Sequence, residues 1–459
     1  MTDREASAAT SRTSYGTLPL AYTPADQRAL ILRLAWPAIL EMVLHMFVWI
    51  VDTAMVGRLG AAALSAVGLG GQVCWTVMWF IGSMSTGITV TVAQSLGAQQ
   101  PRTAARQATT GLALSLAGSL VVMALLIPCA PWVFRAARAE PPVPELGIAY
   151  MRILTLAAPF MLFMMAGNAI LRAGGDTRTP LLVTALTNAL NVVGDYVLIF
   201  GKLGLPALGV EGAAWAAFGG HVVGAAVLAS VLQGGRVAQV INLRARPSMA
   251  HARDLLRLSL PAGLEGLLMD GARTVSMFLI ARLGTVPFAA HQVTAAAESL
   301  SFMPGHGFAV AATVLMGQYQ GAGEQELGRR ATWQAAALAA GIMAAIASSF
   351  LLFPTALVSM FTPDRAVVTI AARCLRIAGL MQPLIGVLGV LSGSLRGAGD
   401  TRTPMLISSV VSWAVRLPLV YLVVMTHPTL TAVWWAILCQ EVARAAATTW
   451  VFVRRYRPR

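Results

Sequence analysis

Residues 171–180 read LRAGGDTRTP and residues 395–404 read LRGAGDTRTP, with identical residues at eight of the ten positions. The offset that aligns Leu171 with Leu395, called the repeat offset below, also aligns other landmarks along the chain, and this distinguishes a duplication from mere similarity in hydropathy. The other pairs are Pro37 and Glu41 with Pro261 and Glu265, residues 58–60 with 282–284, and Gln94 and Gly97 with Gln318 and Gly321. The chain therefore consists of two homologous halves.

The composition places both halves in a membrane. Of the 459 residues, 57% are hydrophobic and 11% are charged, and the mean hydropathy is +0.70, which is too apolar for one soluble core. Apolar segments of about 20 residues, the length that crosses a bilayer, recur throughout. The N-terminal segment 1–27 is mostly polar or small, so we expect no cleaved signal peptide. We predict twelve transmembrane helices, at 32–56, 63–93, 107–131, 147–170, 180–201, 210–232, 255–281, 288–317, 331–354, 368–394, 404–425 and 430–452.

The position of the basic residues indicates the orientation. There are 33 basic and 19 acidic residues, a net charge of +14. With the N-terminus in the cytoplasm, most Lys and Arg residues fall in loops on that side, as the positive-inside rule requires. We expect both termini in the cytoplasm of a bacterial inner (plasma) membrane, with the basic loops against anionic lipid. We expect no binding to nucleic acid.

An even number of helices in each half gives both halves the same orientation, related by a pseudo-twofold axis along the membrane normal. The predicted fold is an all-α integral membrane protein with two six-helix lobes around a central cavity. Its predicted parts are a cytoplasmic tail (1–31), an N-terminal lobe (32–233), a cytoplasmic linker (234–254), a C-terminal lobe (255–453) and a basic tail (454–459). Duplicated lobes of this kind move solutes by opening the cavity alternately to each side.

The repeated GDTRTP loop has a structural and a functional interpretation. In the structural one, which we favour, Gly and Asp (Asp176 or Asp400) turn the chain, the second Thr caps the next helix, and Pro occupies its first turn. In the functional one, Arg172 and Arg396 contribute to a gate at the cytoplasmic boundary of the lobes.

Some ionisable residues lie inside predicted spans, where a charge costs at least a few kcal/mol and so indicates function. Asp52 and Asp195 lie six and seven residues before the basic residues that mark the outer boundary, about 9–10 Å deep at 1.5 Å per residue. Asn188, Asn191 and Asp195, spaced i, i+3 and i+7, share one helix face. These oxygen ligands suit a proton or a hard monovalent cation such as Na⁺. The alternative is that the two carboxylates only make hydrogen bonds between helices.

From Pro37, through VDTAMVGRLG at 51–60, to the two LRxxGD loops, the sequence resembles the multidrug and toxic-compound extrusion (MATE) family. This family belongs to the superfamily of multidrug, oligosaccharidyl-lipid and polysaccharide flippases. The resemblance covers nearly the full chain and implies cation-coupled efflux of small, amphipathic, often cationic compounds by a working monomer, without cofactor or covalent chemistry. It also implies that Asp52, Asn191 and Asp195 form a coupling site for H⁺ or Na⁺. A hydroxyl that some members contribute from the sixth helix is replaced by Ala217 or a neighbouring Ala, which favours H⁺.

The carboxylates of the second half are harder to assign. Glu265 corresponds to Glu41 by the repeat, and we favour a helix-packing role for it over a place in the substrate cavity. Asp270 and Glu298 are candidates to attract a cationic substrate, with pairing to an Arg such as Arg273 as the alternative.

A second cation site is not expected. Some relatives carry a carboxylate eight residues after the Pro of the seventh helix and another on the tenth, but here the first position is Met269 and residues 373–394 contain no acid. The four Cys residues lack metal-ligand spacing, so the only metal considered is Na⁺ at Asp52, Asn191 and Asp195.

Two other functions remain as alternatives. A flippase for a lipid-linked saccharide or another amphipathic lipid shares the superfamily, but twelve helices and central carboxylates speak against it. A membrane enzyme would need convergent catalytic groups such as HExxH or GxSxG, and neither motif occurs in the sequence. The sequence therefore favours a transporter.

Overall fold

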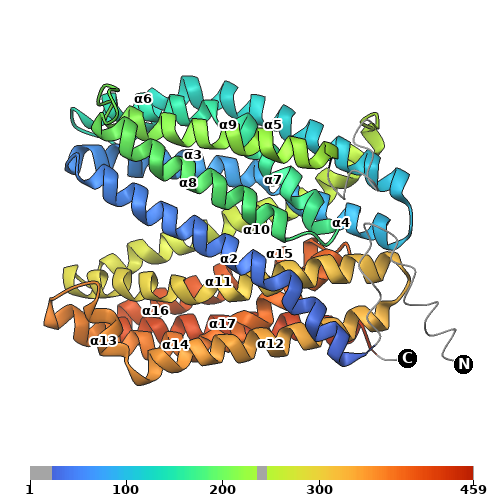
Figure 1. Cartoon of the computed structure of the whole chain (residues 1–459). Coiled ribbons are helices and arrows are strands. Elements are labelled where there is room, and N and C mark those ends of the chain that lie inside the picture. The colour runs from blue at the N-terminus through green and yellow to red at the C-terminus, as the bar shows by residue number, and fades with distance from the viewer. Residues whose placement is uncertain (1–22, 235–244, 458–459) are drawn as a thin grey trace, which may run out of the picture. The chain divides into compact units, whose positions relative to one another are not determined.

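Helices account for almost all of the chain that the structure describes. The computed structural model describes residues 23–234 and 245–457, and within these ranges it contains helices and no strand, which confirms the predicted all-α fold. The elements, labelled in Figure 1, are α2 (Pro24–Gly57), α3 (Ala61–Gly82), α4 (Met84–Gly97), α5 (Pro101–Ala136), α6 (Val143–Leu156), α7 (Ala158–Ala173), α8 (Arg178–Phe200), α9 (Val210–Gly234), α10 (Met249–Ala281), α11 (Thr285–Gly321), α12 (Gln325–Leu352), α13 (Pro354–Ser359), α14 (Arg365–Gly397), α15 (Arg402–Val410), the π-helix η1 (Val411–Arg416), α16 (Leu417–Thr426) and α17 (Leu430–Arg455).

Eight helical segments of the described chain are long and apolar enough to cross a membrane. Two bent pairs, α6 with α7 at 46° and the two parts of α11 at 43°, raise the number to ten. The other two predicted spans fall on α10 and α17, which have 33 and 26 residues but carry ionisable residues such as Asp270 and Glu441. At 1.5 Å per residue these helices are about 50 and 39 Å long, which exceeds the thickness of the hydrocarbon core.

The chain divides into two compact units. One comprises residues 40–263; the other comprises residues from 264 onward together with the start of α2 up to Ile39. The division falls inside α2 and inside α10 at corresponding positions, since the repeat offset aligns Ile39 with Gly263. The units differ from the predicted lobes, 32–233 and 255–453, in two places. The first half of α2 belongs to the second unit, and the first half of α10 belongs to the first unit.

That the two predicted lobes act as separate functional units stays a prediction. Parts of the predicted tails and linker, namely residues 1–22, 235–244 and 458–459, lie outside the described residues.

Each exchanged half-helix packs closely within its unit. In the first unit, α10 approaches α4 so closely that a Cβ at Gly87 would lie 2.7 Å from the Leu255 carbonyl oxygen. In the second unit, a Cβ at Gly307 of α11 would lie 2.9 Å from the Ala35 carbonyl oxygen of α2. Glycine permits both approaches because it has no side chain.

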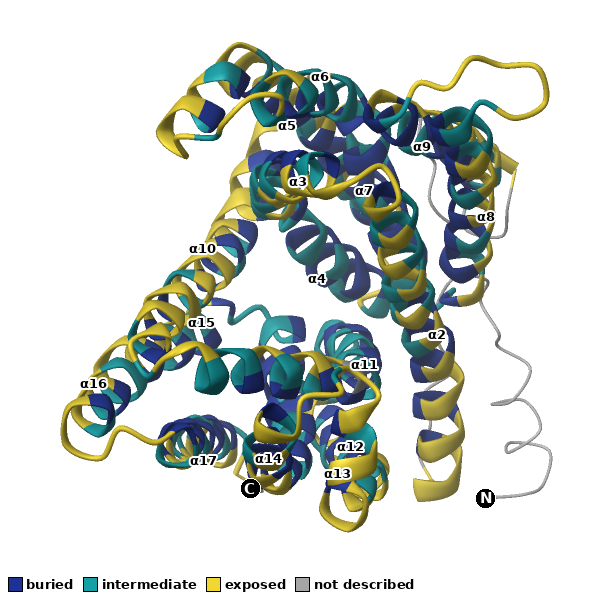
Figure 2. Cartoon of the chain, turned by 90° about the vertical axis from the view of Figure 1, so that its left-hand side faces the viewer, coloured by how far each residue is buried: buried dark blue, intermediate teal, exposed yellow. Residues whose placement is uncertain are grey.

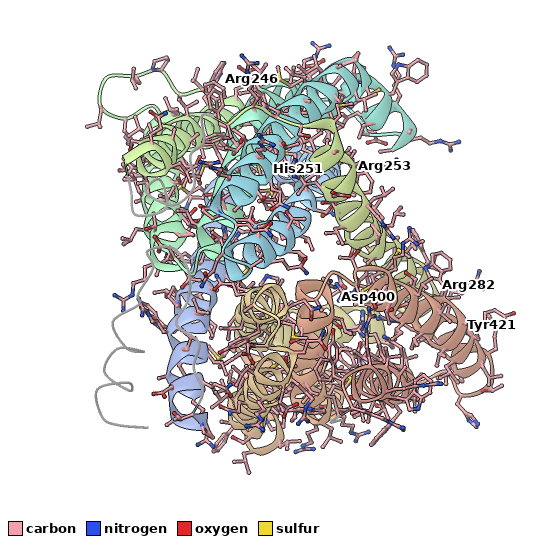
Figure 3. All side chains as sticks on the ribbon, turned by 90° about the vertical axis from the view of Figure 1, so that its right-hand side faces the viewer. Arg246, His251, Arg253, Arg282, Asp400 and Tyr421 are labelled. Carbon is pink, nitrogen blue, oxygen red and sulfur yellow. The ribbon has the colours of Figure 1, made fainter. Side chains whose placement is uncertain are left out.

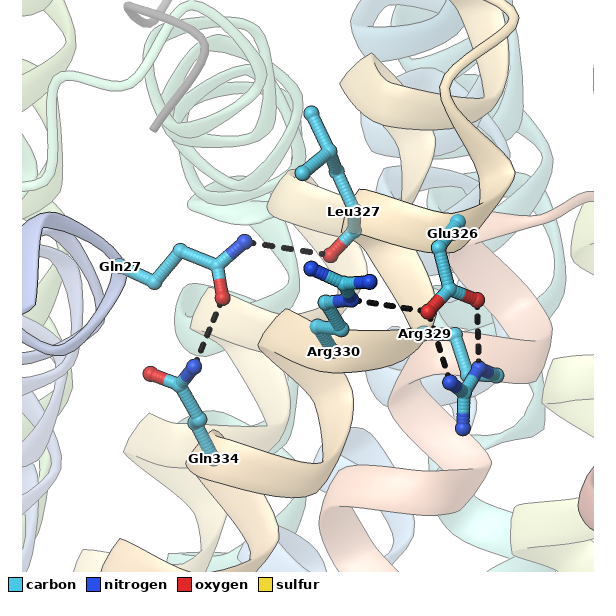
Figure 4. Close-up of polar contacts among 6 residues, drawn as sticks. All are labelled: Gln27, Glu326, Leu327, Arg329, Arg330 and Gln334. Atoms are coloured by element: carbon cyan, nitrogen blue, oxygen red, sulfur yellow. Dashed lines mark hydrogen bonds and ion pairs between the residues drawn. The ribbon is translucent and has the colours of Figure 1, made fainter. Parts of the chain in front are cut away.

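Hydrogen bonds to α12 also hold the start of α2 in the second unit (Figure 4). Gln27 Nε2 donates to the Leu327 carbonyl oxygen at 3.5 Å, and Gln334 Nε2 donates to Gln27 Oε1 at 2.8 Å. Beside them on the surface of α12, Glu326 pairs with Arg329 at 2.7 Å and with Arg330 at 2.8 Å.

The distribution of apolar side chains is that of a protein in lipid. Leu182 and Val193 on α8 and Trp132 on α5 expose 67%, 61% and 68% of their surface, and such positions are yellow in Figure 2. By contrast, Leu391 and Leu395 of α14 are fully buried in the second unit. Apolar side chains so widely exposed would be costly in water, whereas contact with lipid tails removes that cost.

The repeated loop is capped by its aspartates, so the predicted capping by the second Thr is wrong. Asp176 Oδ1 accepts from the backbone N–H groups of Arg178 and Thr179 at 3.1 and 3.0 Å, while the Thr179 hydroxyl donates to Asp176 Oδ2 at 2.6 Å. Asp400, labelled in Figure 3, makes the equivalent bonds with Thr403 at 3.0 and 2.6 Å. The charged carboxylate is the stronger acceptor for the free N–H groups of a helix start, and the Thr lies already inside the first turn.

Candidate functional site

The carboxylate of Asp52 on α2 meets the amide of Asn191 on α8. With the amide oriented to satisfy its neighbours, Asn191 Nδ2 donates to the two carboxylate oxygens of Asp52 at 3.1 and 3.3 Å. Asn191 Oδ1 in turn accepts from the backbone N–H of Ala217 on α9 at 3.1 Å. Three helices of the first unit are therefore joined through one amide.

Asp195 completes this group and is more deeply buried. It follows Asn191 by one turn on the same face of α8, only 1% of its surface is exposed, and its carboxyl group interacts electrostatically with that of Asp52. Neither Asp195 oxygen accepts a hydrogen bond from any group in the described part of the chain. A buried acceptor without a donor is costly, and two adjacent carboxylates cannot both stay ionised cheaply.

Small residues on α9 let α8 approach closely enough to form the site. Gly212, Ala216, Gly220 and Gly224 follow at intervals of four and so lie on one helix face. A Cβ at Gly220 would lie 3.0 Å from the Thr187 carbonyl oxygen and 3.6 Å from Asn191 Cβ. Such small-residue seams are typical of closely packed transmembrane helices, and this one brings the Ala217 backbone within reach of Asn191.

The structure adds two groups to the predicted site, the Tyr150 side chain and the Ala217 backbone N–H, whereas the amide nitrogen of the predicted residue Asn188 makes no hydrogen bond to the described residues there. Tyr150 on α6 lies near enough to interact electrostatically with both Asp52 and Asp195. Sequence reasoning missed it because an isolated Tyr in an apolar span has the same appearance as a packing residue. The backbone N–H of Ala217 was missed because main-chain groups leave no signal in sequence. Asn188 is buried, but its amide nitrogen has no hydrogen-bond partner among the described residues.

Glu41 and Glu265 form equivalent ion pairs in the two units. Glu41 Oε2 lies 3.1 Å from Arg172 Nη1, and Glu41 Oε1 accepts from a Thr hydroxyl of α8 at 3.4 Å. Glu265 Oε2 lies 2.8 Å from Arg396 Nη2, and Glu265 Oε1 accepts from the Ser408 hydroxyl at 2.9 Å. Each Glu thus joins the first helix of its half to the two helices that flank the repeated loop. Because Glu265 is engaged in this way, it is not a free carboxylate for a substrate.

The other acidic candidates of the second unit have different surroundings. The Asp270 side chain is 68% exposed and lies 3.8 Å from Arg273 on the same helix. Glu298 on α11 accepts a hydrogen bond from Gln382 Nε2 of α14 at 3.5 Å. Arg273 and Arg416 also attract Glu298 electrostatically. Among the described residues, no ion pair or hydrogen bond therefore joins Asp270 to Glu298.

Comparison with known proteins gives matches over both halves. The MatE family model matches residues 37–197 and 261–422. A probable multidrug resistance protein NorM of Thermotoga maritima is 32% identical over 407 residues, 89% of this chain and 88% of that protein. A probable NorM of Pseudomonas putida is 30% identical over 94% of this chain and 95% of that protein.

Solved structures agree in fold as well as in sequence. A multidrug resistance MATE transporter in an outward-facing conformation is similar with a TM-score of 0.87 at 26% identity, over 94% of this chain and 96% of that chain. A transporter of the same superfamily from Pyrococcus furiosus, described by the reverse polarity of its binding pocket, gives the same values.

Proposed function

The chain belongs to the multidrug and toxic-compound extrusion (MATE) family, and from this premise we propose that it exports amphipathic, mainly cationic organic compounds in exchange for H⁺. Members of the family are transporters rather than enzymes and need no cofactor. The proposed coupling site is Asp52, Asn191 and Asp195, and the proposed location is the bacterial inner membrane with both termini in the cytoplasm. We also propose that the working unit is a monomer in contact with lipid.

The observation that carries the proposal is the pair formed by the half-buried Asp52 and the buried Asp195, which has no basic partner among the described residues. No Lys, Arg or His side chain of the described residues forms an ion pair with Asp52 or Asp195. Charge inside a bilayer costs at least a few kcal/mol per group, and a cation shared by the two carboxylates offsets much of that cost. Binding or release of one cation therefore changes the free energy of this site greatly.

The hydrogen bonding of Asn191 favours a proton over Na⁺. In the amide orientation that satisfies its neighbours, the carbonyl oxygen accepts from Ala217 and the N–H groups donate to Asp52. Hard metal cations take several oxygen ligands, yet here the amide presents donors where a metal would need an acceptor. A proton needs only the two carboxylates, which supports H⁺ as the coupling ion.

We propose that protonation of this pair changes how α2 packs against α8 and thereby expels the substrate. The energy for that step comes from the proton gradient, because the carboxylate pair binds its proton on one side and loses it on the other. The exposed Asp270 is the proposed point of attraction for a cationic substrate, since Glu265 is already paired with Arg396.

Reconstituted vesicles provide the test. Purified protein is incorporated into liposomes, either a pH gradient or a Na⁺ gradient is imposed, and transport of a fluorescent organic cation is followed. We expect transport under the pH gradient, and its loss in Asp52→Asn and in Asp195→Asn. Asp254→Asn, at an exposed carboxylate near the start of α10, is the matched control and is expected to transport normally.

Two outcomes would contradict the proposal. Normal transport in both Asp variants would remove these residues from coupling. Absence of transport under either gradient, with correctly inserted protein, would favour a lipid-linked substrate instead.

A further inference from the structure

The fifth span of the second half differs from that of the first by one π-helical turn. In the first half α8 is an unbroken α-helix, whereas the corresponding span passes from α15 through η1 into α16. A π turn accommodates one additional residue, so residues beyond it are turned back by about one position. By the repeat offset Asn191 corresponds to Val415, but at the end of the π turn Arg416 takes that place on the helix face.

The contact that Arg416 makes agrees with this register. Arg416 Nε donates to Ser276 Oγ at 3.1 Å. Ser276 is the counterpart of Asp52 by the repeat offset and is fully buried on α10. The hydrogen bond between Arg416 and Ser276 therefore joins the same two places as the bond between Asn191 and Asp52. In the second half a guanidinium and a hydroxyl stand where the first half has an amide and a carboxylate.

Carboxylates from two other helices surround this guanidinium. Glu441 on α17 is the counterpart, by the repeat offset, of Ala217, the residue whose backbone holds Asn191 in the first half. Glu441 and Glu298 both attract Arg416 electrostatically, while Arg273 and Arg444 are the neighbouring positive charges. Arg444 also pairs with Glu441 at 3.2 Å. The half-buried Glu298 and the buried Glu441 of the second unit thus have resident cations, which the pair Asp52 and Asp195 lacks.

We propose that Arg416 is a tethered cation, whose guanidinium occupies in the second half the place where the first half takes up its coupling ion. Glu298 and Glu441 then bind no exchangeable cation, and each molecule couples through one site. This inference rests on the proposed function, because the first-half site supplies the comparison. Arg416 acts here as a positioning residue that keeps the second half in one charge state throughout transport.

The test counts cations bound by the purified, full-length protein in detergent. Proton uptake is measured by potentiometric titration between about pH 9 and 5, a range in which Arg does not titrate, and Na⁺ binding is measured with radioactive sodium. We expect Arg416→Gln to bind one cation per molecule more than the wild type, because Glu298 and Glu441 both lose an attracting positive charge. The additional cation should be lost again in Arg416→Gln with Glu441→Gln, and Arg416→Lys should match the wild type.

The same cation counts distinguish failure of this inference from failure of the proposed function. Asp52→Asn is expected to bind one cation fewer than its parent in both the wild-type and Arg416→Gln backgrounds; an unchanged count there would contradict the first-half site alone. An unchanged count in folded Arg416→Gln would overturn the tethered cation.

Ser276→Asp gives a second route that leaves Arg416 in place. It puts a carboxylate where the first half has Asp52, and because Arg416 already neutralises that position, we expect the wild-type cation count. An additional bound cation in this variant would also overturn the proposal.

Discussion

At the scale of single residues, Glu41 and Glu265 are buried charged side chains that form ion pairs at equivalent positions of the two halves. The Glu41 side chain is 4% exposed and that of Arg172 is 17% exposed. Removing one partner of a buried pair leaves the other charge uncompensated, which costs about 3–5 kcal/mol. We expect Glu41→Gln to lose about 3 kcal/mol, the lower end of that range, because Arg172 keeps some access to solvent. Thermal unfolding in detergent measures the loss.

Glu326→Gln is the matched control for that variant. Its partners Arg329 and Arg330 lie on the surface of α12 (Figure 4), where an ion pair contributes at most about 1 kcal/mol. The double variant Glu41→Met with Arg172→Met should recover most of the stability, since apolar replacements of a whole buried pair are often neutral. If that double variant is stable but transports nothing, the pair has the gating role rather than the packing role.

The residues of the candidate site were predictable to different degrees. Asp52, Asn191 and Asp195 stand out in sequence because ionisable and amide groups are rare in apolar spans, and helical spacing places two of them on one face. Tyr150 and the Ala217 backbone could not be found in this way, since their part depends on which helices pack together.

At the scale of elements, hydropathy predicted where each helix lies but not how it bends or crosses. The 46° bend between α6 and α7 and the π turn that ends at Arg416 arise from packing and local hydrogen bonding, which leave no periodic signal. The division of α2 and α10 between the units was equally invisible, because a repeat in sequence shows which segments correspond and not which segments they contact.

The crossing of α4 with α10 provides a test at this scale. A Cβ at Gly87 would lie 2.7 Å from the backbone carbonyl of Leu255, and backbone cannot move aside as a flexible side chain can. We expect Gly87→Ala to lose about 1–3 kcal/mol, the usual cost of overpacking. Gly266→Ala, at a position of α10 with no atom within 4 Å, is the control and should change the melting temperature little. Equal melting temperatures for the two variants would contradict the close crossing.

At the scale of the whole molecule, orientation in the membrane decides which side Asp52 and Asp195 lie nearer to, whereas the proton gradient decides from which side the proton enters. The two ends of α5 provide markers for it. Arg138 follows the last residue of this helix, whereas the loop with Arg246 (Figure 3) lies near its start, where the Ser248 N–H donates to the Thr110 hydroxyl at 3.1 Å. At 1.5 Å per residue the part of α5 from Thr110 to Ala136 separates the markers by about 39 Å, more than the hydrocarbon core of a bilayer.

The excess of basic residues on one side predicts which marker faces the cytoplasm. With the four native Cys residues replaced, Arg138→Cys should react with a membrane-impermeant maleimide in intact cells, and Arg246→Cys only in inside-out vesicles. Both positions are exposed, so both should react after detergent treatment, which controls for reactivity. The opposite pattern would invert the protein and place Asp52 nearer the cytoplasmic side. An inward pH gradient drives export by antiport in either orientation of the protein, so the labelling result decides from which side of the membrane the carboxylate pair is more directly reached.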